Sequence, residues 1–371
     1  ATASTPITST AGTTLYYVNQ ENSLNCKSDT AIIPVIVSPI ISNNGIASNQ
    51  TICSGSTPST LTQVGALSGG GGNYTYQWQF STDGGATWNN IATATNNSYA
   101  PGNISVTTMY RRIVMSYSCT DTSAAVTISI QGSLSNINIS AAQTICSGTV
   151  PLQLNGDLPV GGSGTYTYTW ESSLNNSTWT TIPSANGQDY QPTALTTSTY
   201  FRRKTIAGTC SAYSSSILIT VNPIPVVTNK QNLIVCANSS VNSISFSSTP
   251  TNNVTLAWDN NNTNIGLAAS GTGSLPTFIS TNNSNPKIPE EATITVTPTY
   301  TNAGKSCIGS AMSFKIIVLP NISIATIPDE NVCSGTTINA ITPTHDAGTF
   351  SGSTLTYNWT VSGSGTTLTN G

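Results

Sequence analysis

The sequence contains few charged residues and a single histidine. Lys, Arg, Asp and Glu make up 6% of its 371 residues, whereas a soluble domain usually has about 25%. The net charge of −3 gives no electrostatic reason to expect nucleic acid or an acidic lipid surface as a partner. Any Ser-His-Asp triad or histidine-containing zinc site would depend on His345 alone. We therefore expect no enzyme activity, no metal and no other cofactor.

Long hydrophobic runs are absent as well. A membrane-spanning helix needs about 18 or more apolar residues, and the longest apolar run, Ala31–Val37, has the length of a strand and contains a proline. We therefore expect no membrane span. The chain starts at Ala1 without an initiator methionine, a basic n-region or an apolar signal-peptide core. This pattern is typical of a mature or excised piece.

Serine, threonine and asparagine take the place of the missing charges, with 150 of the 371 residues. Apolar residues still account for 37% of the chain, and there are 30 glycines. The chain can therefore bury hydrophobic cores, and wholesale disorder is not expected. At about 100–200 residues per domain, the length allows two to four domains.

A set of landmarks recurs along the chain with a period of 90 to 97 positions. Each copy has a first cysteine and, 22 to 26 positions later, a tryptophan in an aromatic segment; in three copies a second cysteine follows the tryptophan by 40 to 49 positions. The first cysteines are Cys53, Cys146, Cys236 and Cys333, the tryptophans Trp78, Trp170, Trp258 and Trp359, and the second cysteines Cys119, Cys210 and Cys307. Constant order and spacing indicate a tandem repeat.

Within one period the residues predict short β-strands. Apolar and polar residues alternate with period two in residues 125–130 and 217–221, and Gly and Asn clusters separate such segments. No helical pattern longer than a turn is present. Several strands per period, with a tryptophan between two cysteines, predict an all-β fold of antiparallel β-sandwiches. We expect the four tryptophans of the repeat to be core residues.

The repeated residues resemble a known group of proteins. The order Ile-Cys-Ser-Gly, Tyr-x-Tyr-x-Trp, Tyr/Phe-Arg-Arg, Cys and a final Thr/Val strand is similar to the tandem Ig-like and PKD-like repeats of giant Bacteroidota surface adhesins. The resemblance implies Ig-like sandwiches, export by the type IX route and a place in an adhesin stalk, with no catalytic residues to transfer. It is weaker in residues 223–319, which lack the arginine pair and have a longer interval between Trp258 and Cys307.

The landmarks divide the chain into five segments. Residues 38–131, 132–222 and 223–319 each form a complete repeat, the third divergent. Residues 1–37 align with the C-terminal half of a repeat, with Cys26 in place of a second cysteine, and residues 320–371 align with an N-terminal half. The linkers are short and contain proline but no Gly/Ser tract, which favours a semi-rigid rod.

Two regular pairing schemes are open to the cysteines. Pairs within a repeat, separated by 64 to 71 positions, are Cys53–Cys119, Cys146–Cys210 and Cys236–Cys307. Pairs across a linker, such as Cys119–Cys146, are separated by 26 or 27 positions. The last strand and the linker run in one direction at about 3.3 Å per residue, which takes the next cysteine far beyond the ~7 Å that a disulfide allows between Cα atoms. We therefore predict the pairs within repeats, in an oxidising extracellular setting, with Cys26 and Cys333 paired to the adjoining repeat or copy.

The arginines and two further tryptophans offer candidate binding sites. Arg111-Arg112 and Arg202-Arg203 lie on predicted strands, where alternation turns one arginine of each pair outward. Either they stack on Trp or Tyr, or they contact an anionic glycan or a neighbouring domain. Trp88 and Trp179 follow the core tryptophans by ten and nine positions. Either they pack back on those tryptophans, or they form exposed platforms for sugar rings.

The leading hypothesis is an extracellular structural and adhesive rod or filament segment, part of a bacterial surface adhesin. The alternative is an array of glycan-binding modules that use Trp88 and Trp179; a hydrolase is a distant third, because paired acids and histidines are missing. Placed in succession, the two half-repeats put Cys333 and Cys26 64 positions apart, as in a complete repeat. We therefore expect neighbouring repeats or copies as head-to-tail partners, either in one continuous array or between chains by strand complementation.

Overall fold

The computed structural model describes residues 5–6, 8–284, 288–333, 335–337, 341–345, 356–358 and 360. They form two compact units. Unit 1 comprises Ala1–Ala142, Leu152–Pro192 and Thr199–Leu218, and unit 2 comprises Gln143–Pro151, Thr193–Ser198 and Ile219–Gly371. The boundary passes through the second repeat, so that each junction between consecutive complete repeats lies inside one unit. The predicted core residue Trp359 lies outside the described residues.

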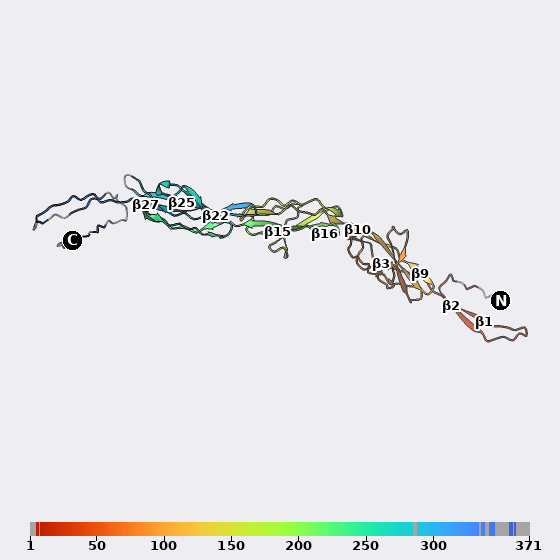
Figure 1. The fold of residues 1–371 in the computed structure, drawn as a ribbon. Coiled ribbons are helices and arrows are strands. Elements are labelled where there is room, and N and C mark those ends of the chain that lie inside the picture. Colours follow the sequence, from red (N-terminus) through yellow and green to blue (C-terminus); the bar gives the residue numbers. More distant parts are fainter. Residues whose placement is uncertain are drawn as a thin grey trace. The chain divides into compact units, whose positions relative to one another are not determined.

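The first repeat folds into short strands in unit 1 (Figure 1). They are β3 (Gly45–Ile46), β4 (Gln50–Cys53), β5 (Gln63–Val64), β6 (Thr75–Ser81), β7 (Asn89–Asn90), β8 (Thr108–Ser116), β9 (Cys119–Thr122) and β10 (Val126–Ser135). The main sheet has the order β10-β8-β6-β7, and β4 and β9 pair with β10 and β8. Along β8, buried residues alternate with more exposed ones, because successive side chains of a strand point to opposite faces.

Trp78 lies at the centre of the first sandwich. It is fully buried beside Leu61, Tyr110 and Ile128. The second layer is less regular and contains the β3–β5 pair and an antiparallel bridge between Leu61 and Tyr99. The indole N–H of Trp78 donates to the carbonyl of Asn96 at 2.9 Å, so the buried ring leaves no unpaired donor.

The second repeat has the same strand pairs. Its strands are β11 (Gln143–Cys146), β12 (Val160–Gly162), β13 (Thr167–Ser173), β14 (Thr180–Thr181), β15 (Thr199–Ala207), β16 (Cys210–Tyr213) and β17 (Ile217–Asn222). In unit 1, β13 pairs with β14 and β15, and β15 pairs with β16. Trp170 on β13 is fully buried and donates to the carbonyl of Gly187 at 3.0 Å.

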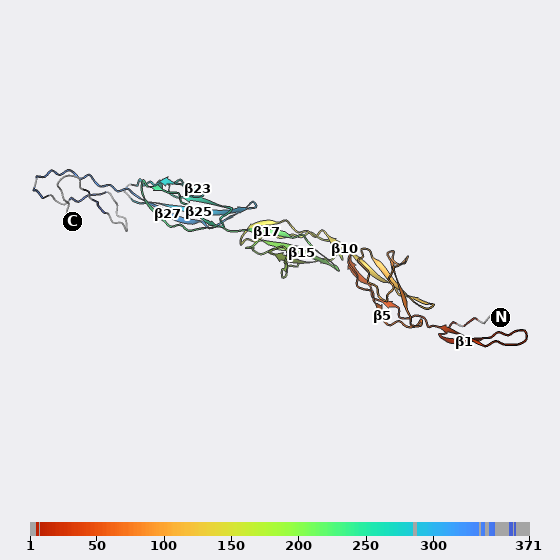
Figure 2. The same cartoon turned by 60° about the horizontal axis from the view of Figure 1, so that its bottom comes forward.

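The third repeat lies in unit 2 (Figure 2). Its elements are β18 (Val226–Val227), β19 (Leu233–Cys236), β20 (Ser240–Val241), β21 (Ser248–Thr249), β22 (Val254–Asn260), the 3-10 helix η1 (Thr263–Ile265), β23 (Ser270–Thr272), β24 (Phe278–Ile279), β25 (Glu290–Asn302), β26 (Lys305–Ile308) and β27 (Met312–Leu319). The sheet order is β19-β27-β25-β22-β23, with β26 paired to β25. Trp258, 3% exposed, lies in the core with Ile294 and Phe314.

One parallel pair recurs in every complete repeat. The first-cysteine strand pairs in parallel with the last strand: β4 with β10, β11 with β17, and β19 with β27. The other pairs of the main sheets are antiparallel. Two layers, antiparallel main strands and one parallel edge are Ig-like features, so the chain consists of tandem Ig-like β-sandwiches, as the sequence predicts.

Residues before the first complete repeat form a separate hairpin. Strands β1 (Gly12–Val18) and β2 (Ala31–Val37) pair in antiparallel register and make a sheet of two strands. The hairpin exposes large apolar side chains, with Tyr17 66% and Ile36 71% exposed. Strands β8 and β10 of the first repeat pair in the same antiparallel way.

Replacement of Trp170 by alanine should reduce the free energy of unfolding by about 3–5 kcal/mol, because it removes a large, fully buried side chain. Denaturant unfolding followed by circular dichroism measures the loss. Trp179→Ala is the matched control: this indole is only half-buried, and its removal should cost less than about 1 kcal/mol. Equal losses for the two variants would mean that Trp170 is not a core residue.

Candidate functional site at the junctions between repeats

The first-strand cysteines lie at the end of each repeat where its last strand leaves, here called the exit end. Cys53 is the last residue of β4 and pairs in register with Gln131 on β10; Cys146 ends β11 and pairs with Asn222 on β17. Because the paired strands are parallel, each first strand carries its cysteine in the direction of the next repeat.

The second cysteines lie at the tips of the hairpins that each repeat points back toward the preceding one, and are here called hairpin cysteines. Cys210 begins β16 after the turn from β15, and Cys307 lies on β26 after the turn from β25. The Sγ of Cys210 is 3.5 Å from the carbonyl oxygen of Gly132, in the last part of β10. Strands β10 and β16 are neighbours there (Figure 1).

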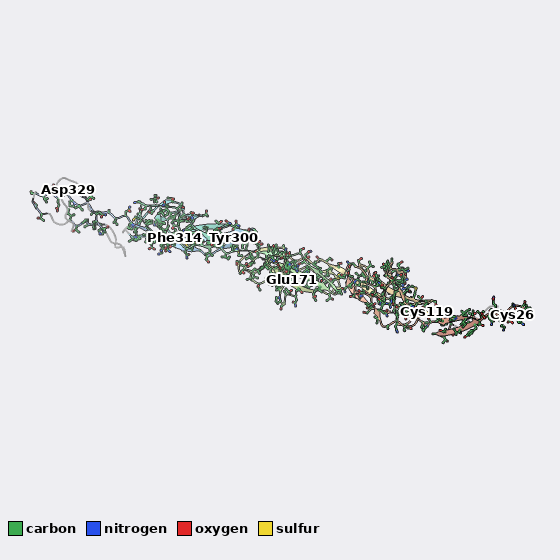
Figure 3. The ribbon with its side chains drawn as sticks, turned by 90° about the horizontal axis from the view of Figure 1, so that it is seen from below. Cys26, Cys119, Glu171, Tyr300, Phe314 and Asp329 are labelled. Carbon is green, nitrogen blue, oxygen red and sulfur yellow. A yellow bond between two sulfur atoms is a disulfide. The ribbon has the colours of Figure 1, made fainter. Side chains whose placement is uncertain are left out.

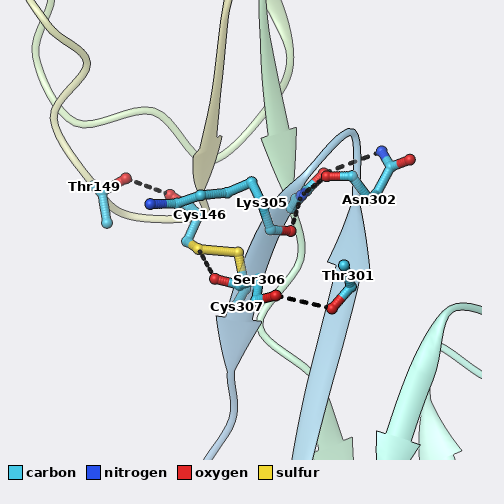
Figure 4. The surroundings of a disulfide bond; sticks show 8 residues. Cys146, Thr149, Thr301, Asn302, Lys305, Ser306 and Cys307 are labelled. Carbon is cyan, nitrogen blue, oxygen red and sulfur yellow. Dashed lines mark hydrogen bonds between the residues drawn. A yellow bond between two sulfur atoms is a disulfide. The ribbon is translucent and has the colours of Figure 1, made fainter.

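Each exit-end cysteine forms a disulfide with the hairpin cysteine of the following repeat. Cys53 bonds to Cys210, with their Cα atoms 5.0 Å apart, and Cys146 bonds to Cys307, at 5.6 Å. Figure 4 shows the second bridge, with Lys305 and Asn302 of the hairpin beside it. The bonded residues are 157 and 161 positions apart, so the two bridges overlap along the sequence.

These bonds correct the pairing expected from the sequence. The predicted bridges Cys53–Cys119, Cys146–Cys210 and Cys236–Cys307 are wrong, because Cys53, Cys146, Cys210 and Cys307 have other partners and Cys119 and Cys236 are free. The hairpin tip does lie at one end of its sandwich. The first cysteine, however, stands at the end of its strand and not at the start, and therefore reaches the opposite end.

A side-chain amide reinforces each bridge from the residue opposite the first-strand cysteine. The Oε1 of Gln131 accepts hydrogen bonds from the backbone N–H and the hydroxyl of Thr209, both at 2.9 Å. The amide of Asn222, 1% exposed, donates to the carbonyls of Asn302 and Lys305 at 3.0 and 3.1 Å. These contacts hold the hairpin of the next repeat on the exit end of the previous one.

The sequence analysis missed the two amides, although one spacing could have identified them. Gln131 follows Cys119, and Asn222 follows Cys210, by the same twelve positions. In the third repeat the residue twelve positions after Cys307 is Leu319, which is the register partner of Cys236 but has no side-chain amide. A second signal is Gly208: a Cβ there would lie 2.6 Å from the side chain of Gln131, so only glycine allows this approach without displacement.

Four cysteines are free in the structure: Cys26, Cys119, Cys236 and Cys333. Cys119 and Cys26 are labelled in Figure 3, where Cys26 lies in the loop that joins β1 and β2. Cys119 is partly buried and the other three are exposed. Two of them, Cys236 and Cys333, belong to the first-strand class by sequence, and the other two to the hairpin class.

The outward arginines lie over the two further tryptophans. The guanidinium of Arg111 is 4.2 Å from the ring centre of Trp88, and that of Arg202 is 4.1 Å from that of Trp179. Arg202 also forms an ion pair with Glu171 at 2.7 Å. Both indoles are half-buried, and a cation occupies one face of each ring, so at most the other face is open to a ligand.

The inward arginines are buried in the sandwiches, and none of the carboxylates in the described part of the chain forms an ion pair with them. Arg112 and Arg203 are both fully buried. Arg112 donates to the side-chain oxygen of Asn44 at 2.8 Å, and Arg203 donates to the carbonyls of Gln188 and Asp157, both at 2.8 Å. Burial lowers the pKa of both guanidinium groups. Carbonyl and amide oxygens thus solvate two charges inside the sandwiches.

Other kinds of site were also sought. In the described part of the chain, no group of three or more His, Cys, Asp and Glu side chains is placed to share a metal ion. None of the described residues belongs to a helix with the length and hydropathy of a membrane span. His345 forms a β-bridge with Ile324.

Two stretches of the chain, residues 42–132 and 135–223, match a family described as a domain of unknown function (DUF8696). They amount to 180 of the 371 residues, and each falls close to one complete sequence repeat. A search of curated proteins found no significant match.

Solved structures of Ig domains are similar to this chain only at low identity. Sidekick-1 immunoglobulin domains 1–5 are 14% identical over 85% of this chain and 68% of that chain, with a TM-score of 0.28. The complex of Dpr2 Ig1–Ig2 with DIP-Theta Ig1–Ig3 is 11% identical over 74% of this chain and 99% of that chain, with a TM-score of 0.33. The insect immune protein hemolin is 13% identical over 78% of this chain and 79% of that chain, with a TM-score of 0.26. Likeness at this level carries no argument about function.

Replacement of Asn222 by alanine should cost about 1–3 kcal/mol in the free energy of unfolding, because the carbonyls of Asn302 and Lys305 lose a buried donor. Denaturant unfolding of the oxidised protein followed by circular dichroism measures the cost. Asn229→Ala, at an exposed residue before β19, is the matched control and should change stability by less than about 0.5 kcal/mol. A neutral Asn222→Ala would contradict the role of this amide at the junction.

Proposed function

We propose that this chain is a segment of an extracellular, mechanically reinforced rod or filament that serves adhesion at a bacterial cell surface. The observation that carries the proposal is the position of the disulfides, which join consecutive repeats and do not close single ones. A bridge of this kind does not cross-link the strands of one sandwich to each other. It adds a second covalent connection at the place where tandem domains are otherwise held by a single linker.

The overlap of the bridges protects the whole region between them. Every backbone bond from Cys53 to Cys307 lies inside at least one of the two disulfide-closed loops. Under tension the shortest covalent path between these two residues crosses both bridges and follows the chain between Cys146 and Cys210. At about 3.45 Å per extended residue, this path limits the extension to roughly 230 Å, instead of roughly 880 Å for the unbridged chain. A tether under load benefits from such a limit.

Compartment and composition support the same function. Disulfides persist in oxidising, extracellular surroundings, and Cys53–Cys210 and Cys146–Cys307 each close a loop that is worth about 5 kcal/mol in the chain-entropy model. The chain is rich in Ser, Thr and Asn and poor in charge. The resemblance of the repeats to stalk domains of giant Bacteroidota adhesins points to the same role. The five-segment domain division, the rod arrangement and head-to-tail neighbours are parts of this proposal.

A nick in the backbone provides the test. Lys230 lies in the loop before β19, and trypsin cleavage after it should leave the two fragments joined by Cys146–Cys307 until reductant is added. Mass spectrometry and non-reducing gels measure this. The free thiols are alkylated first, so that no interchain disulfide holds a fragment. Cleavage after Lys27, outside both loops, is the internal control and should release its N-terminal peptide without reductant.

The variant Cys146→Ser should convert the Lys230 nick into an immediate separation. Separation of the unmodified nicked chain under non-reducing conditions would overturn the proposal, since the pairs within repeats give that result and leave the linker as the only connection.

The glycan-binding array remains the second candidate, because Trp88 and Trp179 keep part of their surface exposed. A sugar that stacks on these indoles should shield them from iodide and reduce the quenching of their fluorescence. We expect no such protection by neutral oligosaccharides, because Arg111 and Arg202 already cover one face of each ring. The Trp88→Phe/Trp179→Phe variant shows how much of the quenched fluorescence comes from these two indoles. If a sugar protects the unmodified chain from iodide quenching but does not protect this variant, the glycan-binding array is favoured.

A further inference from the structure

The geometry points to two interchain disulfides, Cys119 to Cys333 and Cys236 to Cys26, by which a second copy of this chain joins the first head to tail. In each bond the two residues come from different copies. This inference rests on the proposed head-to-tail association and specifies its partner and its bonds. It differs from the sequence expectation, which pairs Cys333 with Cys26.

The two observed bridges supply the rule. In both, the bond joins the first-strand cysteine of one repeat to the hairpin cysteine of the next. The four free thiols comprise two of each class. Applied to each contact between successive copies, the rule assigns Cys236 and Cys333 of one copy to Cys26 and Cys119 of the next. The thiols at the two outer ends stay free for a further copy.

Cys119 occupies the same place as the bonded Cys210. The Sγ of Cys210 is 3.9 and 3.5 Å from the carbonyl oxygens of Gln131 and Gly132, and the Sγ of Cys119 is 3.9 Å from that of Pro39. Pro39 stands at the same distance along the chain from Cys26 as Gly132 does from Cys119. The hairpin tip of the first repeat therefore lies on the linker in the position that forms a bridge at the next junction.

Ser38 marks the place where the missing first-strand cysteine belongs. The residue twelve positions after a hairpin cysteine is the register partner of a first-strand cysteine in all three complete repeats. For Cys26 that residue is Ser38. Ser38 and Cys119 line the same hollow of about 540 Å³, together with Val37 and Tyr117. A strand paired in parallel with β2 would place its cysteine here, within reach of Cys119.

The exposed apolar face of the β1–β2 hairpin indicates what brings that strand. In complete repeats the counterpart of β1 pairs with the tryptophan strand and the counterpart of β2 with the first-cysteine strand. Residues 320–371 contain both sequences, around Trp359 and Cys333, and contain no second cysteine. The occupant is therefore residues 320–371 of a second copy, which would cover the face that carries Tyr16, Ile33 and Val35. Ile33, 51% exposed, and Val35 are the register counterparts of the buried Val126 and Ile128 of the first repeat.

The same docking accounts for Cys236. It ends β19 opposite Leu319, at the exit end of the third repeat, and is exposed. At the equivalent ends, Cys53 and Cys146 receive the hairpin cysteine of the following repeat. When residues 320–371 of one copy and the hairpin of the next form that following repeat, its hairpin cysteine is Cys26. Each docking event thus sets two bridges in adjacent positions.

Each bridge forms by thiol–disulfide exchange with an external small disulfide such as oxidised glutathione. Two cysteine thiols lose two protons and two electrons as the S–S bond forms, and the external disulfide gains both and leaves as two thiols. No group of the protein other than the two thiols is consumed.

Mixed-isotope peptide mapping tests the inference. Equal amounts of ¹⁴N- and ¹⁵N-labelled chain are oxidised together in a glutathione buffer and digested without reductant. We expect disulfide-linked heavy–light peptides that join Cys119 to Cys333 and Cys26 to Cys236, while Cys53–Cys210 serves as the isotope-pure internal reference. Heavy–light Cys26–Cys333 or Cys119–Cys236 peptides, or a monomer whose four thiols are all alkylated, would overturn it.

Single-site variants separate the two bonds. Cys119→Ser should abolish the Cys333 peptide and leave the Cys26–Cys236 peptide, and Cys236→Ser should do the reverse; the double variant should lose all covalent dimer. A chain that passes the Lys230 nick test but yields other interchain pairs refutes this inference alone. A chain that fails the nick test refutes the proposed function itself.

Discussion

The parallel pairing of the first-cysteine strand with the last strand is the constraint on which the junctions depend. In an antiparallel neighbour the first strand would run back toward the start of its repeat. Because β4 and β11 run with β10 and β17, they deliver Cys53 and Cys146 to the exit end. The hairpin of the next repeat approaches the same point from the other side. The disulfide between repeats is therefore a consequence of strand direction, and the cysteines fix a contact that the sheets already create.

Polar groups are used sparingly and mostly where backbone would otherwise be left unpaired. Asn222 binds two carbonyls of the next hairpin, and Gln131 accepts from Thr209 at the equivalent place. Inside the sandwiches, Arg112 and Arg203 bind carbonyl and amide oxygens from loops that carry no regular ladder. A buried charge is costly unless it is well solvated, and here several oxygens per guanidinium supply that solvation. The two buried guanidinium groups thus hold irregular loops against the regular strands through hydrogen bonds.

Much of this structure could be predicted from the sequence. Alternation along residues 125–130 and 217–221 has a physical cause, since one face of each strand is buried, and the tandem Ig-like fold follows from it. The tryptophans could be found because the sequence repeats them at constant spacing. The disulfides could not be found by spacing, because residue counts do not show at which end of a strand a cysteine stands. The amides at the junctions were detectable only through their constant distance along the chain from the hairpin cysteines.

The bridge between repeats also has a property that a bridge within a repeat lacks. The second repeat uses Cys210 to bind the repeat before it and Cys146 to bind the repeat after it. An added repeat brings both classes and continues the pattern without any change elsewhere. A repeat divided between two chains separates the classes and leaves unpaired thiols on both sides of the division. When the halves meet in register, the strands place each sulfur opposite its partner. In the proposed filament, the chemistry that strengthens a junction would therefore also favour the correct neighbour.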